Sequence, residues 1–307
     1  MNIRLSIIIP TYKRFQSLQK TLYSVQQNRI EESEVLVIDQ SPDNSENSKK
    51  IQVQYPFVQY ICCNTPGLPQ ARNIGIMKSI GSILCFIDDD VIVHSSCFKE
   101  HMLLHSKKNI DAIAGRIVQK NKHYAWESIS TVAVIDYLTG ETKGNFDLDY
   151  TGNVLFATGG HMSIKRTVFH TVGLFNQRFY GNALYEDVEF FFRMRKKGFT
   201  IHYNPLAIIY HYPLETGGCH NSKGYQYYLE RLHNQTLFFL LHISLFPPIS
   251  YSKYCKNLIE YISRNKNKTY SVKRVFLCIL ILCKAYSNAI LSILYTPKLR
   301  QKQNIKE

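Results

Sequence analysis

Three carboxylates follow directly on a strongly apolar segment in the N-terminal half of the chain. Asp88, Asp89 and Asp90 come after the run from Ser82 to Ile87. An apolar run of this length, bounded by polar residues, is typical of a buried β-strand. Three adjacent carboxylates repel one another unless positive charge lies among them. Mg²⁺ or Mn²⁺ with bound phosphate groups would supply that charge, and this interpretation is favoured over a helix N-cap, which needs only one Asp.

Polar residues also follow two earlier apolar runs. Leu5 to Ile9 precedes Pro10-Thr11-Tyr12-Lys13-Arg14, and Glu34 to Ile38 precedes Asp39-Gln40-Ser41. A strand-like run at 58–62 and helical spacing at 17–28, with Ser17 as N-cap, and at 69–78 complete an alternation of strands and helices. This alternation predicts an α/β protein with a doubly wound, mostly parallel sheet. Ligands of such sheets bind outside the carboxyl ends of the strands, where the polar segments should converge.

Five short motifs occur in order along residues 3–213. They are Pro10-Thr11-Tyr12-Lys13-Arg14, Val37-Ile38-Asp39-Gln40-Ser41, Ala71-Arg72-Asn73-Ile74-Gly75, Asp88-Asp89-Asp90, and Tyr185-Glu186-Asp187-Val188-Glu189 followed by Arg193 and Lys196-Lys197-Gly198. In order and spacing they resemble the motifs of family 2 glycosyltransferases of the GT-A fold. Each motif alone would be a weak signal, whereas the five together are specific.

The resemblance implies a division of the chain into two parts. Residues 1–215 are expected to form a GT-A catalytic domain around a Rossmann-like, mixed but mostly parallel sheet. Its nucleotide-sugar half would span about residues 1–115 and its acceptor half about residues 116–215. Residues 216–307 are expected to form a basic, helical C-terminal appendage.

The resemblance also implies transfer of a sugar from a nucleotide-sugar to an acceptor hydroxyl group, with inversion at the anomeric carbon. The leaving nucleoside diphosphate gains negative charge, which Mg²⁺ or Mn²⁺ held by Asp88 and Asp90 would stabilise. His211 ends an apolar run, where a histidine completes the metal shell in some relatives. A lone histidine is as often a packed structural residue, so both roles stay open.

The reaction needs a carboxylate base to take the proton of the acceptor hydroxyl group. By resemblance this base is Asp187, and Glu186 contacts the acceptor or orients the loop. Composition alone leaves a second interpretation open. A carboxylate in the first turn of a helix is favoured by the helix dipole without any catalytic role.

The remaining site residues are assigned by the same resemblance. The candidates for nucleotide binding are Pro10, Thr11, Tyr12, Arg14, Asp39, Arg72, Asn73 and Asp89. Tyr12 is expected to pack on the base and Asp39 to accept a hydrogen bond from it, although Gln40 replaces the acid of many relatives. The candidates for acceptor binding are Gly159, Gly160 and His161, because paired glycines let the backbone approach a ligand closely. Ordinary turns, a capped helix and a β-bulge are the structural alternatives.

The C-terminal region carries most of the net charge of +14. From Tyr251 onward, twelve Lys and Arg residues stand against two Glu residues. Two apolar stretches between residues 275 and 295 are separated by Lys284. Because a charge at the centre of a spanning helix is costly, we expect a helix on an anionic membrane surface, with a buried core helix as the alternative. A lipid-linked glycan acceptor would fit this arrangement.

The apolar run at residues 3–9 is short and is followed by Pro10 and Lys13, so a signal peptide is not expected. The chain has eight cysteines and no C-x-x-C pair, and these are expected to be reduced core thiols, neither disulfides nor zinc ligands. The sequence thus predicts a cytoplasmic protein, peripheral on the inner face of the cell membrane.

Three other functions agree less well with the sequence than glycosyl transfer. The basic charge surrounds an apolar helix, so a nucleic-acid partner is not expected. A nucleotidyltransferase shares this kind of sheet, but Pro10 to Arg14 contains no glycine-rich loop. A catalytically inactive relative would not need Asp88, Asp90 and Asp187 together.

Overall fold

The computed structural model describes residues 4–42, 44–63, 65–107, 109–119, 131–214, 216–219, 224–247, 250–263 and 272–295. The strands are β1 (Leu5–Thr11), β2 (Ser33–Asp39), β3 (Val58–Cys62), β4 (Ile83–Ile87), β5 (Val91–Val93), β6 (Ala112–Gln119), β7 (Val134–Ile135), β8 (Thr142–Lys143), β9 (Gly152–Asn153), β10 (His161–Lys165) and β11 (Ile201–His211). The helices are α1 (Phe15–Asn28), α2 (Ser45–Gln54), α3 (Leu68–Lys78), α4 (Cys97–His105), α5 (Arg166–Val172), α6 (Glu186–Lys196), α7 (Gly224–Leu241), the 3₁₀ helix η1 (Ile243–Leu245), α8 (Ser250–Ser263) and α9 (Val272–Tyr295). The Lys and Arg residues at 264–271 and 296–307, which belong to the predicted basic C-terminal region, lie outside the described residues.

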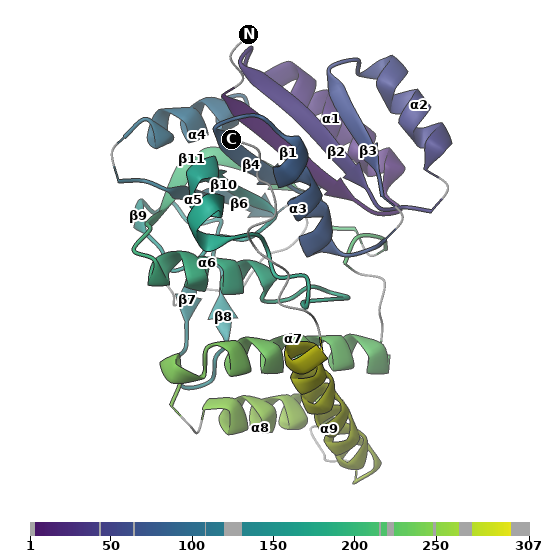
Figure 1. The fold of residues 1–307 in the computed structure, drawn as a ribbon, viewed down its shortest axis with the longest axis vertical. Helices are drawn as coiled ribbons and strands as arrows, with labels where there is room; N and C mark the ends of the chain where they lie inside the picture. Colours follow the sequence, from purple (N-terminus) through teal and green to yellow (C-terminus); the bar gives the residue numbers. More distant parts are fainter. Residues whose placement is uncertain are drawn as a thin grey trace.

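A mixed sheet forms the centre of the molecule (Figure 1). In the described residues its strand order is β3-β2-β1-β4-β10-β6-β11-β5, and β9 pairs with β11. The first four of these strands are parallel, as are β6 and β11, whereas β10 runs antiparallel to both of its neighbours. The prediction of a doubly wound, mostly parallel α/β sheet is therefore confirmed.

Apolar side chains cover both faces of this sheet. On β1, Ile7 and Ile9 pack with α1, α2 and α4, whereas Ile8 packs with α3, α5 and α6. Successive residues of a strand point to opposite faces, so a continuous isoleucine run is buried on both. Helix α1 differs from its prediction, because it begins at Phe15 instead of being capped by Ser17. The chain turns at once after β1 through the left-handed backbone of Lys13, with φ of 56°.

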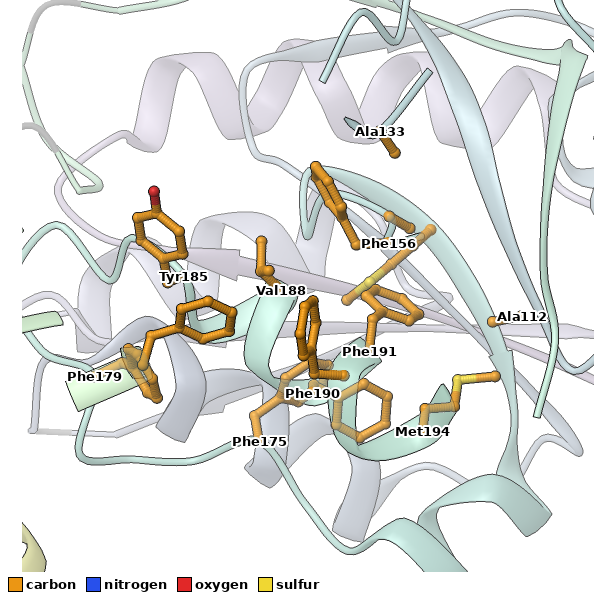
Figure 2. Packing of buried hydrophobic residues seen from close by; sticks show 14 of the residues in the cluster. Ala112, Ala133, Phe156, Phe175, Phe179, Tyr185, Val188, Phe190, Phe191 and Met194 are labelled. Carbon is orange, nitrogen blue, oxygen red and sulfur yellow. The ribbon is translucent and has the colours of Figure 1, made fainter. Parts of the chain in front are cut away.

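Helix α6 contributes a layer of aromatic rings to the core (Figure 2). Phe190 and Phe191 are fully buried, and the ring centroids of Phe190 and Phe175 lie 4.5 Å apart. Rotation of the helix would expose these rings to water. The packing therefore fixes the direction of the first turn of α6, which carries Glu186 and Asp187.

The C-terminal helices lie against the α6 side of the catalytic part (Figure 1). Phe238 of α7 packs on Phe192 of α6 with ring centroids 5.1 Å apart, and both rings belong to the same core cluster as the sheet. Helix α9 contacts α7 and α8, and its Ile281, Ala285 and Ala289 are buried. A second face of α9 carries the exposed apolar side chains Ile279, Leu280, Tyr286, Leu291 and Leu294. Within the described ranges, no helix combines the length and the apolarity needed to cross a membrane.

Asn73 connects α3 to the loop before α6. Its amide NH₂ donates to the carbonyl oxygen of Phe175 at 2.9 Å, and its amide oxygen accepts from the N–H of Phe175, also at 2.9 Å. The Asn73 side chain is buried. The sequence predicts that Asn73 lies near a diphosphate; in the structure it bonds through one amide N–H and its amide oxygen to a loop 102 residues away, and it does not line the pocket.

Replacing Asn73 with Ala should lower the stability of the protein. Two buried backbone groups of Phe175 would lose their partners, and we expect the free energy of unfolding in urea to fall by about 2–4 kcal/mol. Gln19→Ala, which removes an exposed hydrogen bond to Gln54, should change it by less than about 0.5 kcal/mol. Equal stabilities of the two variants would contradict the structural role of Asn73.

Candidate active site

A pocket of about 560 Å³ opens at the carboxyl ends of the parallel strands. Most residues that the sequence assigned to a site line this pocket: Pro10, Thr11, Tyr12, Arg14, Arg72, Asp88, Asp89, Asp90, Gly159, Gly160, Glu186, Asp187 and His211. Asp39, Asn73 and His161 do not line it. The polar segments that follow separate strands thus meet at one rim of the sheet, as the topology required.

Arg14 holds two of the three adjacent carboxylates. Its Nη1 lies 3.2 Å from Asp89 Oδ1 and 3.0 Å from Asp90 Oδ2, and it donates a hydrogen bond to each. Asp89 Oδ2 also accepts from the Thr11 hydroxyl group at 2.6 Å. On its other side Arg14 donates through Nε to the carbonyl oxygen of Thr216 at 3.0 Å. Arg14 is therefore a structural cation of the pocket, and its charge is already shared between two acids.

Asp88, Asp90 and His211 bring their donor atoms within 4.8 Å of one another. His211 reaches this point because β11 pairs with β5, directly after the acid cluster. His211 Nε2 lies 3.0 Å from Asp90 Oδ1, yet the two atoms are not aligned for a hydrogen bond. Asp90 Oδ1 therefore has no hydrogen-bond partner among the described residues, although it is buried. Two carboxylates and an imidazole whose donor atoms converge in this way fit a divalent cation such as Mg²⁺ or Mn²⁺.

Burial and neighbouring charges shift the pKa values of Asp88, Asp89 and Asp90. Burial, and then the neighbouring Asp90, raise the pKa of Asp88. Burial also raises the pKa of Asp89 to about 7, against the opposing effects of Arg14 and Thr11. Burial acts in the same direction on Asp90, but His211 and Arg14 outweigh it and lower the pKa of that group. A bound cation would favour the ionised form of all three carboxyl groups.

Gly159 and Gly160 let the chain pass close to two pocket side chains. A Cβ atom on Gly160 would collide with the Asp88 carboxylate, and one on Gly159 would overlap the Arg72 guanidinium group. The glycine pair therefore shapes the pocket wall around these charged groups. His161, the next residue, is fully buried and contacts α4. It cannot touch an acceptor in the pocket, which corrects the sequence prediction.

Glu186 and Asp187 begin α6 but have different surroundings. Glu186 is buried and forms an ion pair with buried Arg72. Asp187 is half-buried and lines the pocket, and its carboxylate accepts the N–H of Gly159 at 3.0 Å and that of Val188 at 2.8 Å. Each Asp187 oxygen retains a lone pair after accepting one N–H. Asp187 is thus oriented and available, whereas Glu186 is committed to holding α3 against α6.

Arg72 is a buried cation with unused hydrogen-bonding capacity. Burial lowers the pKa of Arg72, while the carboxylates of Asp187 and Asp88 act to raise it. Its Nε has no hydrogen-bond partner among the described residues. The guanidinium carbon lies 5.6 Å from the centre of the Phe175 ring. A guanidinium group with a free donor between two pocket acids suits a phosphate oxygen.

The loop before α6 has a strained backbone. Ala183 and Tyr185 are non-glycine residues in the left-handed region, with φ of 52° and 70°. Such conformations cost free energy and are typical of functional sites, where the surrounding packing enforces them. Tyr185 is held by burial and by donating its hydroxyl group to the carbonyl oxygen of Gly140 at 3.1 Å.

Asp39 occupies a different place from the predicted one. Its carboxylate is buried and accepts the Tyr60 hydroxyl group at 2.6 Å and the N–H of Ser41 at 2.8 Å. Gln40 lines the pocket instead. The prediction that Asp39 contacts the base is not supported by this arrangement, since a neighbouring strand already occupies its carboxylate.

Sequence reasoning missed the contribution of α7 to the pocket. Gln226 and Glu230 line it, although residues 216–307 were assigned to a membrane appendage. Glu230 Oε2 accepts the N–H of Asn182 at 3.0 Å, and the Asn234 amide donates to the carbonyl oxygen of Tyr180 at 3.0 Å. A signal was present in the sequence, because Gln226, Glu230 and Asn234 follow one another at intervals of four and so share one face of the helix.

Comparison with known proteins agrees with the observed fold. The sequence profile of glycosyl transferase family 2 matches residues 6–173. The glycosyltransferase AglE of Haloferax volcanii is 29% identical over 117 residues, which cover 36% of this chain and 38% of that protein. The GalNAc(5)-diNAcBac-PP-undecaprenol beta-1,3-glucosyltransferase of Campylobacter jejuni is 24% identical over 213 residues, which cover 65% of this chain and 62% of that protein. The matches therefore span less than two thirds of the length of these relatives.

The structure of GalNAc-T7 with UDP, GalNAc and Mn²⁺ superposes with a TM-score of 0.64 at 17% identity. The superposition covers 95% of this chain and 57% of that chain, and it confirms the predicted GT-A fold. The family profile spans more than half of the chain and includes the acid cluster of the pocket. The chain therefore belongs to glycosyl transferase family 2.

Proposed function

We propose that the protein is a metal-dependent, inverting glycosyltransferase that moves a sugar from a nucleotide-sugar to a hydroxyl group of a glycan acceptor. One observation carries the proposal: the donor atoms of Asp88, Asp90 and His211 converge in the same pocket as the oriented carboxylate of Asp187. Separate groups can therefore serve the leaving group and the attacking hydroxyl group. The family match favours glycosyl transfer over nucleotidyl transfer.

Asp88, Asp90 and His211 would hold Mg²⁺ or Mn²⁺, which when bound acts as a Lewis acid toward the leaving diphosphate. Arg72, which also lines the pocket, would donate from its guanidinium group to the same diphosphate. Tyr12 and Thr11 at the end of β1, with Gln40 after β2, would contact the nucleoside. The GalNAc-T7 structure, solved with UDP and Mn²⁺, has the same fold and supports this assignment.

Asp187 would take the proton of the acceptor hydroxyl group. The two N–H groups of Gly159 and Val188 hold its carboxylate in one orientation, so little reorganisation is needed when the acceptor arrives. Glu186 would position Asp187 through its ion pair with Arg72. A single displacement of this kind inverts the configuration at the anomeric carbon.

We also propose that α9 associates with an anionic membrane surface, at the inner face of the cell membrane. Its exposed apolar face and exposed Lys284 suit a helix lying in the interface. The name of the Campylobacter relative describes a lipid-linked acceptor, and that of TarP from Staphylococcus aureus, 24% identical over 118 residues, describes poly(ribitol-phosphate). A lipid-linked glycan would reach the pocket of a protein bound to such a surface.

Asp90→Ala should abolish metal-dependent nucleotide binding. In wild-type protein with Mn²⁺, a matching nucleotide-sugar should raise the melting temperature, because it binds only the folded state. The variant removes the carboxylate oxygen that Asp90 offers to the metal and should show neither this shift nor transfer activity, whereas Asp136→Ala, in an exposed turn, should retain both. Wild-type turnover that persists in EDTA would rule out the metal role.

Asp187→Asn should slow the chemical step without weakening donor binding. The amide keeps the size of the carboxylate but cannot take a proton, so we expect kcat to fall by roughly 10² or more. The melting temperature should fall only slightly, because Asn keeps one of the two backbone N–H bonds that Asp187 accepts, whereas Glu186→Gln should lower it further by weakening the buried ion pair. Turnover within a few-fold of wild type, or a product of retained configuration, would place the base elsewhere.

The double substitution Leu291→Glu and Leu294→Glu should weaken binding to vesicles that contain anionic lipid. It places two negative charges on the exposed face of α9, and we expect affinity to fall by at least about tenfold. Leu103→Glu with Leu206→Glu is the matched control, because these leucines are also exposed but lie outside the C-terminal helices. Equal binding of both double variants would show that α9 does not face the membrane.

A further inference from the structure

A second group of potential metal ligands lies beneath α4, outside the pocket. Cys97, His101 and His161 offer ligand atoms that all lie within 4.8 Å of one another. His161 Nε2 is 3.0 Å from His101 Nε2 and 3.3 Å from Cys97 Sγ. All three side chains are fully buried, and none of them lines the pocket.

The fold brings these three residues together from two elements. Cys97 and His101 are four residues apart on α4, which places them one above the other on the same helix face. His161 opens β10, beneath that face. A Cβ atom on Gly115 of β6 would overlap the His161 ring, so the imidazole has its place only because this position is glycine.

The hydrogen bonds around His161 leave one close neighbour of its Nε2 without a matched partner. Its Nδ1 lies 3.1 Å from the carbonyl oxygen of Arg116, which can only accept, so Nδ1 carries the proton. Nε2 then has one lone pair, and two groups face it: His101 Nε2 and Cys97 Sγ. One aromatic lone pair accepts one hydrogen bond well, which leaves one of these groups unmatched.

A metal ion bound by Cys97, His101 and His161 would give each of these three side chains a partner. With His161 and His101 both ligating through Nε2, their Nδ1–H groups donate to the Arg116 carbonyl oxygen and to Ser163 Oγ, which lies 2.7 Å from His101 Nδ1. The Ser163 hydroxyl group then donates to His105 Nε2 at 2.8 Å. Ligating histidines in proteins almost always donate their second ring N–H in this way.

We propose that Cys97, His101 and His161 bind a zinc ion that holds α4 to the sheet. In a tetrahedral site with Zn–N of about 2.0–2.1 Å and Zn–S of about 2.3 Å, ligand nitrogens lie about 3.3 Å apart and a nitrogen and a sulfur about 3.6 Å apart. The observed 3.0 Å and 3.3 Å differ from these spacings by only a few tenths of an ångström. Thiolate and imidazole together favour zinc over the oxygen-preferring ions of the pocket.

Binding converts the Cys97 thiol to a thiolate, so one proton leaves to solvent as the S–Zn bond forms. One thiolate and two neutral imidazoles leave a charge of +1 on the site. The sequence expectation that no cysteine binds zinc rested on the missing C-x-x-C pair, whereas the relevant pattern is C-x-x-x-H on one helix.

The test uses the full chain with Asp90→Ala, so that the pocket contributes no metal. After zinc is supplied and unbound ions are removed by dialysis, we expect about one zinc ion per chain. Replacement of zinc by Co²⁺ should produce a thiolate-to-cobalt charge-transfer band in the near ultraviolet, which carboxylate and imidazole ligands do not give. Absence of a bound ion, or Co²⁺ binding without this band, would overturn the proposal, and neither measurement depends on a destabilised variant.

Variants then identify the ligands. Cys97→Ala and His161→Ala should each weaken zinc binding by more than about 100-fold. His105→Ala is the matched control, because it removes another buried histidine of α4 that lies one hydrogen bond away from the ligands, and it should retain the ion. Zinc affinity in Cys97→Ala equal to that of His105→Ala would overturn the site.

Discussion

The buried ion pair between Arg72 and Glu186 connects the two halves of the pocket. Arg72 belongs to α3 and Glu186 to α6, and both side chains are shielded from water. Breaking such a pair leaves an uncompensated buried charge, so the two helices cannot separate without a large cost. The pair fixes the first turn of α6, and with it the carboxylate of Asp187 opposite Gly159. The distance between the acid cluster and the base candidate therefore depends on this contact.

Electrostatics also explains why so many charges can share one small pocket. Several buried charges have a partner of opposite sign on a different element, such as Arg14 for Asp89 and Asp90 and Arg72 for Glu186. At the group of Asp88, Asp90 and His211, by contrast, Asp90 Oδ1 is buried and has no hydrogen-bond partner among the described residues. The pocket thus combines charges held in ion pairs with a point at which a ligand would bind.

Much of the fold and the pocket rim could be predicted because the signals are local. The strands β1, β2 and β4 are continuous apolar runs, and each stops at a polar residue, so the rim follows from the topology. The roles of Asp39 and His161 could not be predicted, because they depend on partners from other elements, Tyr60 of β3 and His101 of α4. No local sequence pattern indicates which residue of another element such a side chain will contact.

The two faces of the sheet need very different lengths of chain to cover them. The cluster beside α1, α2 and α4 is built between Leu5 and Phe98, with Ile209 as its one later member among the described core residues. The opposite cluster, which includes Ile8 of β1, is completed by residues as late as Ala289. Because synthesis proceeds from the N-terminus, one face can be buried early, while the other waits for α5 and α6, which end at Lys196. The nascent protein therefore carries an apolar sheet face until α6 has been made, and α7 to α9 then extend the same core outward from α6, where Phe238 packs on Phe192.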